Sequence, residues 1–144
     1  MHVADILKSK GSNVVTSGAD ETVAATARLL NLKRIGAVVV CDAPGTVIGV
    51  ISERDIIRGI AINGQRALDM RVGELMTSEV IVCKPTDTIA EVMQVMTDGR
   101  FRHLPVIEDG KLQGIISIGD VVKNRLEETD LEARSLRDYV LAGR

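Results

Sequence analysis

The chain contains one short pattern twice. Residues 49–55 are Gly-Val-Ile-Ser-Glu-Arg-Asp, and residues 114–120 are Gly-Ile-Ile-Ser-Ile-Gly-Asp, 65 positions later. The similarity covers nearly the whole chain, since residues 3–7 (Val-Ala-Asp-Ile-Leu) align with residues 72–76 (Val-Gly-Glu-Leu-Met). A repeat of this length indicates one supersecondary unit built twice. Two such halves related by a two-fold axis would form a pair of clefts, and paired clefts suggest ligand sensing.

Both copies carry the same order of predicted elements, β-α-β-β-α. In the second copy these elements are expected at residues 80–83, 88–96, 104–108, 112–117 and from about 120. In the first copy they are expected at residues 13–16, 22–32, 36–41, 47–52 and 54–61. Thr88 and Glu91 form a capping-box pattern, and Asp109-Gly110 predicts a hairpin turn. The copies differ in length at residues 9–13 and at Pro44-Gly45, where further turns are predicted.

These elements divide the chain into three predicted parts. Residues 1–66 form a first domain with its connector, residues 67–125 a second domain, and residues 126–144 a C-terminal helical tail. In the tail, Ala133, Leu136 and Val140 share one helical face. We expect this helix to pack on a partner or on its dimer mate.

Composition excludes several classes of function. The net charge of -2 comes from interspersed signs, and Phe101 and Tyr139 are the only large aromatic residues, which argues against a nucleic-acid surface. The apolar run at residues 35–41 is far shorter than the ~20 residues that span a bilayer. The first ten residues include Asp5 and Lys8 rather than a signal-peptide core. These features predict a cytoplasmic protein.

Catalysis and metal binding are not indicated. Cys41 and Cys83 lie in strand-like contexts without metal-ligand spacing, so free thiols are expected. His103 is the one plausible catalytic histidine, but no oxyanion hole or third orienting group accompanies it. Asp55 and Asp120 occupy equivalent positions in the repeat, which predicts parallel roles rather than an acid and a base.

The repeated Ser-x-x-Asp has two compatible interpretations. Ser52 with Asp55, and Ser117 with Asp120, match a capping box at the start of a helix. An aspartate also offers two acceptor oxygens to the vicinal hydroxyls of a ribose, and a serine at a helix N-terminus suits an anionic phosphate. A single copy would favour the cap, whereas duplication within one fold favours a ligand cleft.

Together these features resemble a tandem pair of cystathionine-β-synthase (CBS) domains over residues 1 to about 125. Residues 102–106 (Arg-His-Leu-Pro-Val) resemble the third-strand signature of that family, and residues 72–77 resemble the segment that opens many of its units. The resemblance implies an α/β fold in which two β-α-β-β-α CBS repeats pack by a pseudo-two-fold into one module, here followed by the tail helix. It also implies a regulatory module that binds AMP, ADP or ATP, sometimes NAD(H) or S-adenosylmethionine, and performs no catalysis.

The resemblance further implies which residues line each cleft. The first cleft would combine Ser52, Arg54 and Asp55 with Val82, Lys84, Arg102, His103 and Leu104. The second cleft would combine Ser117 and Asp120 with Thr16, Ile35, Gly36, Ala37 and Val38.

The two clefts differ in charge. Glu53-Arg54 lies within the first motif where Ile118-Gly119 lies within the second, so we expect the first cleft to be more cationic. It would prefer a more phosphorylated or dinucleotide ligand held by Arg54 or Arg58, and the second cleft would hold a simpler nucleotide such as AMP. We expect a homodimer that signals to a separate, unknown protein partner. The alternative is an interaction module with empty clefts that acts by dimerisation and partner docking.

Overall fold

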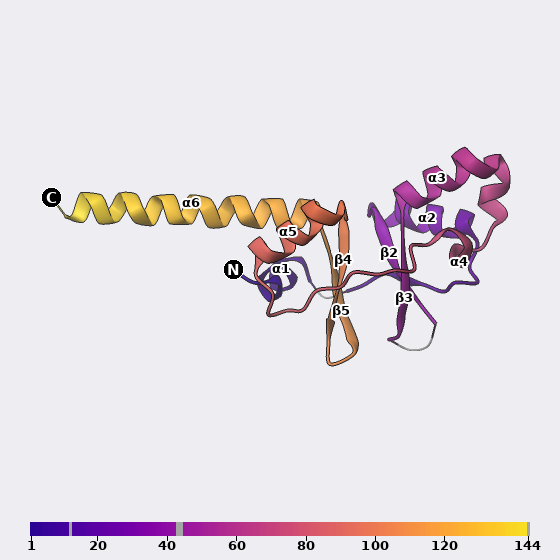
Figure 1. Ribbon diagram of the computed structural model, residues 1–144, viewed down its shortest axis with the longest axis horizontal. Helices are drawn as coiled ribbons and strands as arrows, with labels where there is room; N and C mark the ends of the chain where they lie inside the picture. Colours follow the sequence, from indigo (N-terminus) through magenta and orange to yellow (C-terminus); the bar gives the residue numbers. More distant parts are fainter. Residues whose placement is uncertain (12, 43–44, 144) are drawn as a thin grey trace.

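The protein is a mixed α/β structure with two repeats and a long C-terminal helix (Figure 1). The computed structural model describes residues 1–11, 13–42 and 45–143. The first unit contains β1 (Thr16–Ser17), α2 (Val23–Lys33), β2 (Ala37–Cys41), β3 (Val47–Ser52), α3 (Glu53–Asn63) and the 3-10 helix η1 (Gly64–Asp69). The second contains α5 (Ile89–Gly99), β4 (His103–Glu108), β5 (Lys111–Ser117) and α6 (Ile118–Ala142). Two short helices, α1 (Val3–Lys10) and α4 (Val72–Leu75), open the two copies.

The two sheets are built on equivalent antiparallel hairpins. In the first unit the strand order is β1-β2-β3, with β1 parallel to β2 and β2 antiparallel to β3. In the second unit β4 pairs with β5, and the turn at Asp109 and Gly110 has φ values of 50° and 74°. This confirms the predicted Asp-Gly hairpin, whose turn requires positive φ at both residues. The other predicted turns include residues 12 and 44, which lie outside the described residues.

The strand predicted at residues 80–83 does not form. The segment makes a single parallel bridge, in which Cys83 N donates to Pro105 O at 3.0 Å and Ile107 N donates to Cys83 O at 2.9 Å. A few residues earlier, Thr77 bridges to Val50 of β3. This short segment crosses from the hairpin of one unit to the hairpin of the other, so it cannot run along either hairpin for more than a bridge. The strand predicted at residues 13–16 is likewise short and displaced, since β1 covers only Thr16–Ser17.

Each opening helix packs in the core of the other unit. Val3 and Ile6 of α1 belong to the buried cluster of the second unit, with Ile89 and Leu104. Val72 at the start of α4 belongs to the cluster of the first unit. The two repeats therefore exchange their opening segments and interlock into one module.

Capping side chains define where the helices begin. Thr22 and Thr88 accept hydrogen bonds from backbone N–H groups three residues later, at 3.2 and 3.1 Å, and Glu91 completes the predicted capping box of α5. Ser52 and Ser117 cap α3 and α6 in the same way. These four caps satisfy N–H groups that a helix leaves without partners.

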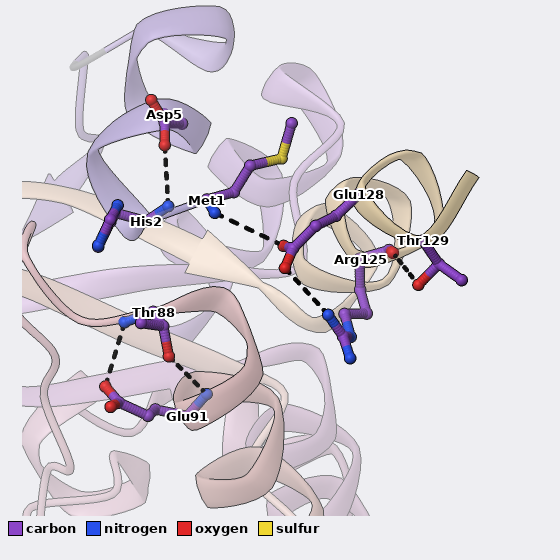
Figure 2. A network of polar contacts seen from close by, with 8 residues as sticks. All are labelled: Met1, His2, Asp5, Thr88, Glu91, Arg125, Glu128 and Thr129. Atoms are coloured by element: carbon purple, nitrogen blue, oxygen red, sulfur yellow. Dashed lines mark hydrogen bonds and ion pairs between the residues drawn. The ribbon is translucent and has the colours of Figure 1, made fainter. Parts of the chain in front are cut away.

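α6 is one continuous helix that runs from the second repeat through the expected tail. No glycine or proline occurs between Asp120 and Ala142, so nothing in the sequence interrupts it. Val121, near the start of the helix, is buried. Further along, Glu128 Oε1 accepts a hydrogen bond from Arg125 Nη1 at 3.0 Å, and its Oε2 lies 3.8 Å from the Met1 amine (Figure 2). Beyond this anchor the helix projects away from the module (Figure 1). Within the described residues, α6 and the other helices lack the length of apolar sequence needed to cross a membrane.

Candidate functional site

A cavity of about 420 Å³ lies between the two units, beside the first Ser-x-x-Asp motif. Five of the residues expected in the first cleft line it together: Ser52, Arg54, Asp55, Arg102 and His103. Other lining residues come from α3, from the segment after α4 and from the end of α5: Glu53, Ile57, Arg58, Thr77, Glu79, Val80, Ile81, Gly99, Arg100 and Phe101. Gly36 and Val50 complete the lining. Its volume falls within the usual range of small-molecule sites.

Asp55 is buried at the wall of this cavity, with 8% of its side chain exposed. Its Oδ2 accepts from Ser52 N at 2.9 Å and from Ser52 Oγ at 3.1 Å, which completes the capping box of α3. Its Oδ1 is held less tightly, because Thr77 Oγ1 lies at 3.3 Å and Arg58 Nη1 at 3.7 Å. One carboxylate oxygen therefore serves the helix, and the other is available to accept from a ligand hydroxyl.

Cationic side chains outnumber carboxylates around the cavity. Four arginines line it, from α3 and from the turn between α5 and β4: Arg54, Arg58, Arg100 and Arg102. Three carboxylates accompany them: Glu53, Asp55 and Glu79. Guanidinium groups bind phosphate oxygens in a bidentate manner, so this lining can hold an anionic group near a hydroxyl acceptor.

His103 joins the two units at the cavity. A Cβ added at Gly36 would lie 3.3 Å from His103 Nε2 and 3.4 Å from Glu53 Oε1, so the first unit's backbone approaches the imidazole closely. Burial lowers the pKa of His103, the charge of Lys10 lowers it further, and Glu53 and Asp120 oppose the shift without reversing it. The imidazole therefore presents a neutral ring to the cavity at neutral pH.

Some residues expected in the first cleft lie elsewhere. The Leu104 side chain is in the core of the second unit, because β4 turns that position inward. Val82 and Lys84 are exposed and outside the cavity lining, and the Lys84 N–H bonds to Asp87 Oδ2 at 2.9 Å. Gly36, which was expected in the second cleft, lines the first cavity instead, because it lies against His103.

The second Ser-x-x-Asp has a different neighbour. Asp120 Oδ2 accepts from Ser117 N at 2.9 Å, as in the first unit, and also from Lys10 Nζ at 2.7 Å. Burial raises the pKa of Asp120, but the hydrogen bonds from Lys10 and Ser117 outweigh this effect and leave the pKa below its usual value. Lys10 also donates to Ile115 O at 2.9 Å, so the lysine is held across the motif. A cation from α1 thus already neutralises the second carboxylate.

The other residues expected in the second cleft lie within β2, beside the first unit's core and at two separate cavities. Ala37 and Val38 are buried within β2, and Ile35 packs on the first unit's core. Thr16 lines an open hollow of about 810 Å³ with residues such as Thr26 and Leu112, and neither Ser117 nor Asp120 is part of its lining. The two motifs are therefore equivalent in local structure but not in surroundings.

Sequence reasoning missed Thr77 and Lys10, although the repeat contained a signal for both. If the alignment of residues 3–7 with residues 72–76 is extended, Lys8 pairs with Thr77 and Lys10 with Glu79. The contacts confirm the equivalence, because an added Cβ at Gly114 would meet Leu7 and one at Gly49 would meet Met76. Each opening helix therefore delivers a residue at or just beyond its C-terminal end to the Ser-x-x-Asp of the other unit.

Both cysteine thiols lie in surroundings that disfavour the thiolate. Burial raises the pKa of Cys83 to about 12 and also raises the pKa of Cys41, so both remain protonated at neutral pH. Within residues 1–11, 13–42 and 45–143, no three His, Cys, Asp or Glu side chains gather as a metal site. The arrangement suits reversible binding of a ligand that carries hydroxyl and phosphate groups.

Comparison with known proteins assigns the family. The CBS domain model matches residues 3–62 and 72–127. The mitochondrial CBS domain-containing protein CBSX3 of Arabidopsis thaliana is 36% identical over 150 residues, which cover 98% of this chain and 72% of that protein. A crystal structure of a CBS-domain containing protein from Agrobacterium tumefaciens is 48% identical, covers 86% of this chain and 92% of its own, and superposes with a TM-score of 0.83. The structure of a protein with CBS domains from Burkholderia ambifaria is 37% identical, covers 88% of this chain and 95% of its own, and superposes with a TM-score of 0.83. The chain therefore belongs to the CBS-domain family, as a tandem pair of CBS repeats with a C-terminal helix.

Proposed function

We propose that this protein is a regulatory module that binds an adenosine-containing ligand between its repeats and signals the occupancy to another protein. The observation that carries the proposal is the first cavity of about 420 Å³, which is lined by buried Asp55 together with four arginines. A more distant CBS domain pair, 22% identical with a TM-score of 0.79, was solved in complex with 5′-methylthioadenosine and S-adenosyl-L-methionine. That neighbour supports the ligand class, and the cavity residues of this chain support the position.

The proposed ligand is AMP, ADP or ATP, or NAD(H), with its ribose on Asp55. The Oδ1 atom accepts from a ribose hydroxyl when the 3.3 Å contact from Thr77 opens. Arg54 and Arg58 lie on α3 beside this carboxylate and bind the phosphates. The first cleft takes the more phosphorylated or dinucleotide ligand. The second cleft, where Lys10 already pairs with Asp120, takes a simpler nucleotide such as AMP.

The proposed role is regulatory rather than catalytic. The ligand leaves as it entered, and the output is a change in a protein partner of unknown identity or in a homodimer of this chain. We place the protein in the cytoplasm, and we propose no membrane or nucleic-acid partner.

Thermal melts with added nucleotide test the proposal. With millimolar AMP, ATP, NAD or S-adenosylmethionine, the melting temperature should rise, because a ligand that binds only the folded state stabilises it by mass action. At a ligand concentration 100 times the dissociation constant, the free energy of unfolding increases by roughly 2.7 kcal/mol. Asp55→Ala should abolish the rise for the ligand of the first cavity, and Arg54→Ala should weaken ATP or NAD more than AMP. Asp69→Ala, which changes an exposed carboxylate outside the cavity, is the matched control. A rise that Asp55→Ala leaves intact would overturn the assignment.

A second candidate function is that of an interaction module with empty clefts. It is favoured by the capping boxes of Ser52 with Asp55 and of Ser117 with Asp120, which are complete without any ligand. On this alternative the motifs only start α3 and α6, and the protein acts by dimerisation and docking. Absence of any melting shift with every adenosine ligand would favour it.

A further inference from the structure

The outer part of α6 exposes an unusual amount of apolar surface. Beyond the anchor at Glu128, all residues from 129 to 143 are exposed, and several of them are large and apolar: Leu131, Leu136, Tyr139, Val140 and Leu141. A helix this far from the module gains no packing energy from the core, and isolated helices are marginal in water. An exposed apolar stripe on such a helix indicates a surface for another protein.

The apolar positions follow a heptad repeat. Val122, Leu126, Thr129, Ala133, Leu136 and Val140 are spaced by alternating steps of four and three residues. This spacing places them on one seam of the helix, as the a and d positions of a coiled coil. Thr129 fits the seam because its hydroxyl donates to Arg125 O at 2.9 Å, which leaves its methyl group for the partner. Leu131 lies on the opposite side of the helix, outside the seam.

The charges that flank the seam indicate the partner. With Leu126, Ala133 and Val140 at a positions, Glu132 is a g position and Arg137 the following e position. In a parallel, in-register pair of helices, a g residue faces the next e residue of the other chain. Glu132 of each copy would then face Arg137 of the other, twice per dimer. Arg125 and Asp130 have the same relation, so both flanking pairs are of opposite charge.

The ion pairs within α6 leave Glu132 and Arg137 available for ion pairs with a second copy of the chain. Arg125 bonds Glu128 at 3.0 Å, and Arg134 bonds Asp130 at 3.1 Å, both within α6. Among the described residues, Glu132 and Arg137 have no ion-pair partner within the chain. Antiparallel pairing about the middle of the seam would instead place Asp130 near Asp130 and Lys123 near Arg137, which are like charges. The charge pattern therefore selects a second copy of this chain, in parallel.

We propose that α6 is a dimerisation helix that forms a parallel, in-register, two-stranded coiled coil with α6 of a second copy. The seam residues bury their apolar side chains between the helices, and Glu132–Arg137 pairs form on both sides. Both CBS modules then lie at the same end of the coil. The proposal extends the proposed homodimer by assigning its surface, and it does not depend on nucleotide binding.

Substitutions on the two sides of α6 test the surface in the full chain. Leu126→Glu and Leu136→Glu place a charge in the seam, at positions where the leucines are 65% exposed in a single copy. Leu131→Glu makes the same change on the opposite side, where the leucine is 60% exposed, and is the matched control. In sedimentation or light scattering, the wild type and Leu131→Glu should have the mass of two copies, and both seam variants the mass of one. A monomeric or trimeric wild type, or a dimer that survives Leu126→Glu, would overturn the proposal.

Charge exchange and cross-linking test the orientation. Glu132→Arg should weaken the dimer by placing like charges together, and the double variant Glu132→Arg/Arg137→Glu should restore it. Glu127→Arg, at an outer position of the helix, should leave the dimer unchanged. In a Cys41→Ser background, Leu136→Cys should form an interchain disulfide, since identical d positions meet in a parallel coil. If the double variant restores the dimer but Leu136→Cys forms no interchain disulfide, the helices are antiparallel and the proposed parallel pairing is wrong. The nucleotide melts are unaffected by these outcomes, so this inference and the proposed function fail independently.

Discussion

Lys10 and Asp120 show how one residue changes the second motif. The lysine reaches from α1 to the Ser-x-x-Asp of the other unit, where its Nζ lies 2.7 Å from the carboxylate. In the first unit, Asp55 instead meets Thr77 and Arg58, at longer distances. The expectation that the first cleft is the cationic one therefore omitted a cation that sits directly on the second carboxylate.

Replacing Lys10 should show how much the Lys10–Asp120 ion pair contributes to the free energy of unfolding. Lys10→Met keeps most of the side-chain volume but leaves the carboxylate of Asp120 without its cation. We expect a loss of about 1 kcal/mol in the free energy of unfolding at pH 7, because partial exposure screens the pair. The pKa of Asp120 is lowered in the folded state, so the stabilisation is present above the carboxyl's unfolded pKa and disappears as pH falls through the folded pKa. Urea denaturation at pH 7 and below pH 4 should show the difference between wild type and variant closing in acid. A difference independent of pH would contradict the ion-pair account.

His103 should make stability depend on pH in a second range. Its pKa is lowered in the folded state, so the unfolded chain binds a proton more readily as pH falls below about 6.5. The contribution is therefore present above the unfolded pKa and is lost as pH falls through the folded pKa. His103→Asn should reduce the fall in melting temperature between pH 7.5 and 5.5. His2→Asn changes the exposed histidine and is the control; an equal effect of both substitutions would argue against His103 as the source.

At the scale of elements, the exchanged opening helices hold the two repeats together. Ile6 of α1 is 1% exposed and lies in the core of the second unit, although it belongs to the first copy in sequence. Ile6→Ala should cost roughly 2–5 kcal/mol, because it leaves a cavity in a packed core. Ile62→Ala, at a side chain that is 75% exposed, should cost much less. Chemical denaturation of both variants measures the difference, and equal losses would contradict the exchanged packing.

Most elements could be predicted from the sequence because their causes are local. The hairpin turn at Asp109-Gly110 and the caps at Thr88, Ser52 and Ser117 act within a few residues. The predictions failed for segments whose secondary structure depends on contacts with distant parts of the chain. Residues 80–83 favour a strand by composition, but they cross between two hairpins and keep only one bridge. The helical form of residues 3–10 was not predicted, because α1 depends on burying Val3 and Ile6 against the other repeat.

At the scale of the whole molecule, residues of both interlocked repeats line the cavity. The helix α6 points away from the repeats (Figure 1). The cavity takes its lining from α3 of one unit, from β4 of the other and from the segment that follows α4. A ligand in it would therefore contact both repeats and report on their relative position. α6 begins at the second motif, where Ser117 caps it, and so connects that motif directly to the proposed dimer surface.

The sequence by itself determined the repeated unit, its hairpins and caps, and hence the position of Ser52, Asp55, Ser117 and Asp120 at two helix starts. Turn conformations and capping hydrogen bonds span few residues, so two copies of one pattern specify two copies of one local structure. Only the tertiary structure decided which residues surround each motif. Lys10 and Thr77 take their places because α1 and α4 cross to the opposite units, and that crossing depends on burial between segments far apart in the chain, such as Leu7 against Gly114 and Met76 against Gly49.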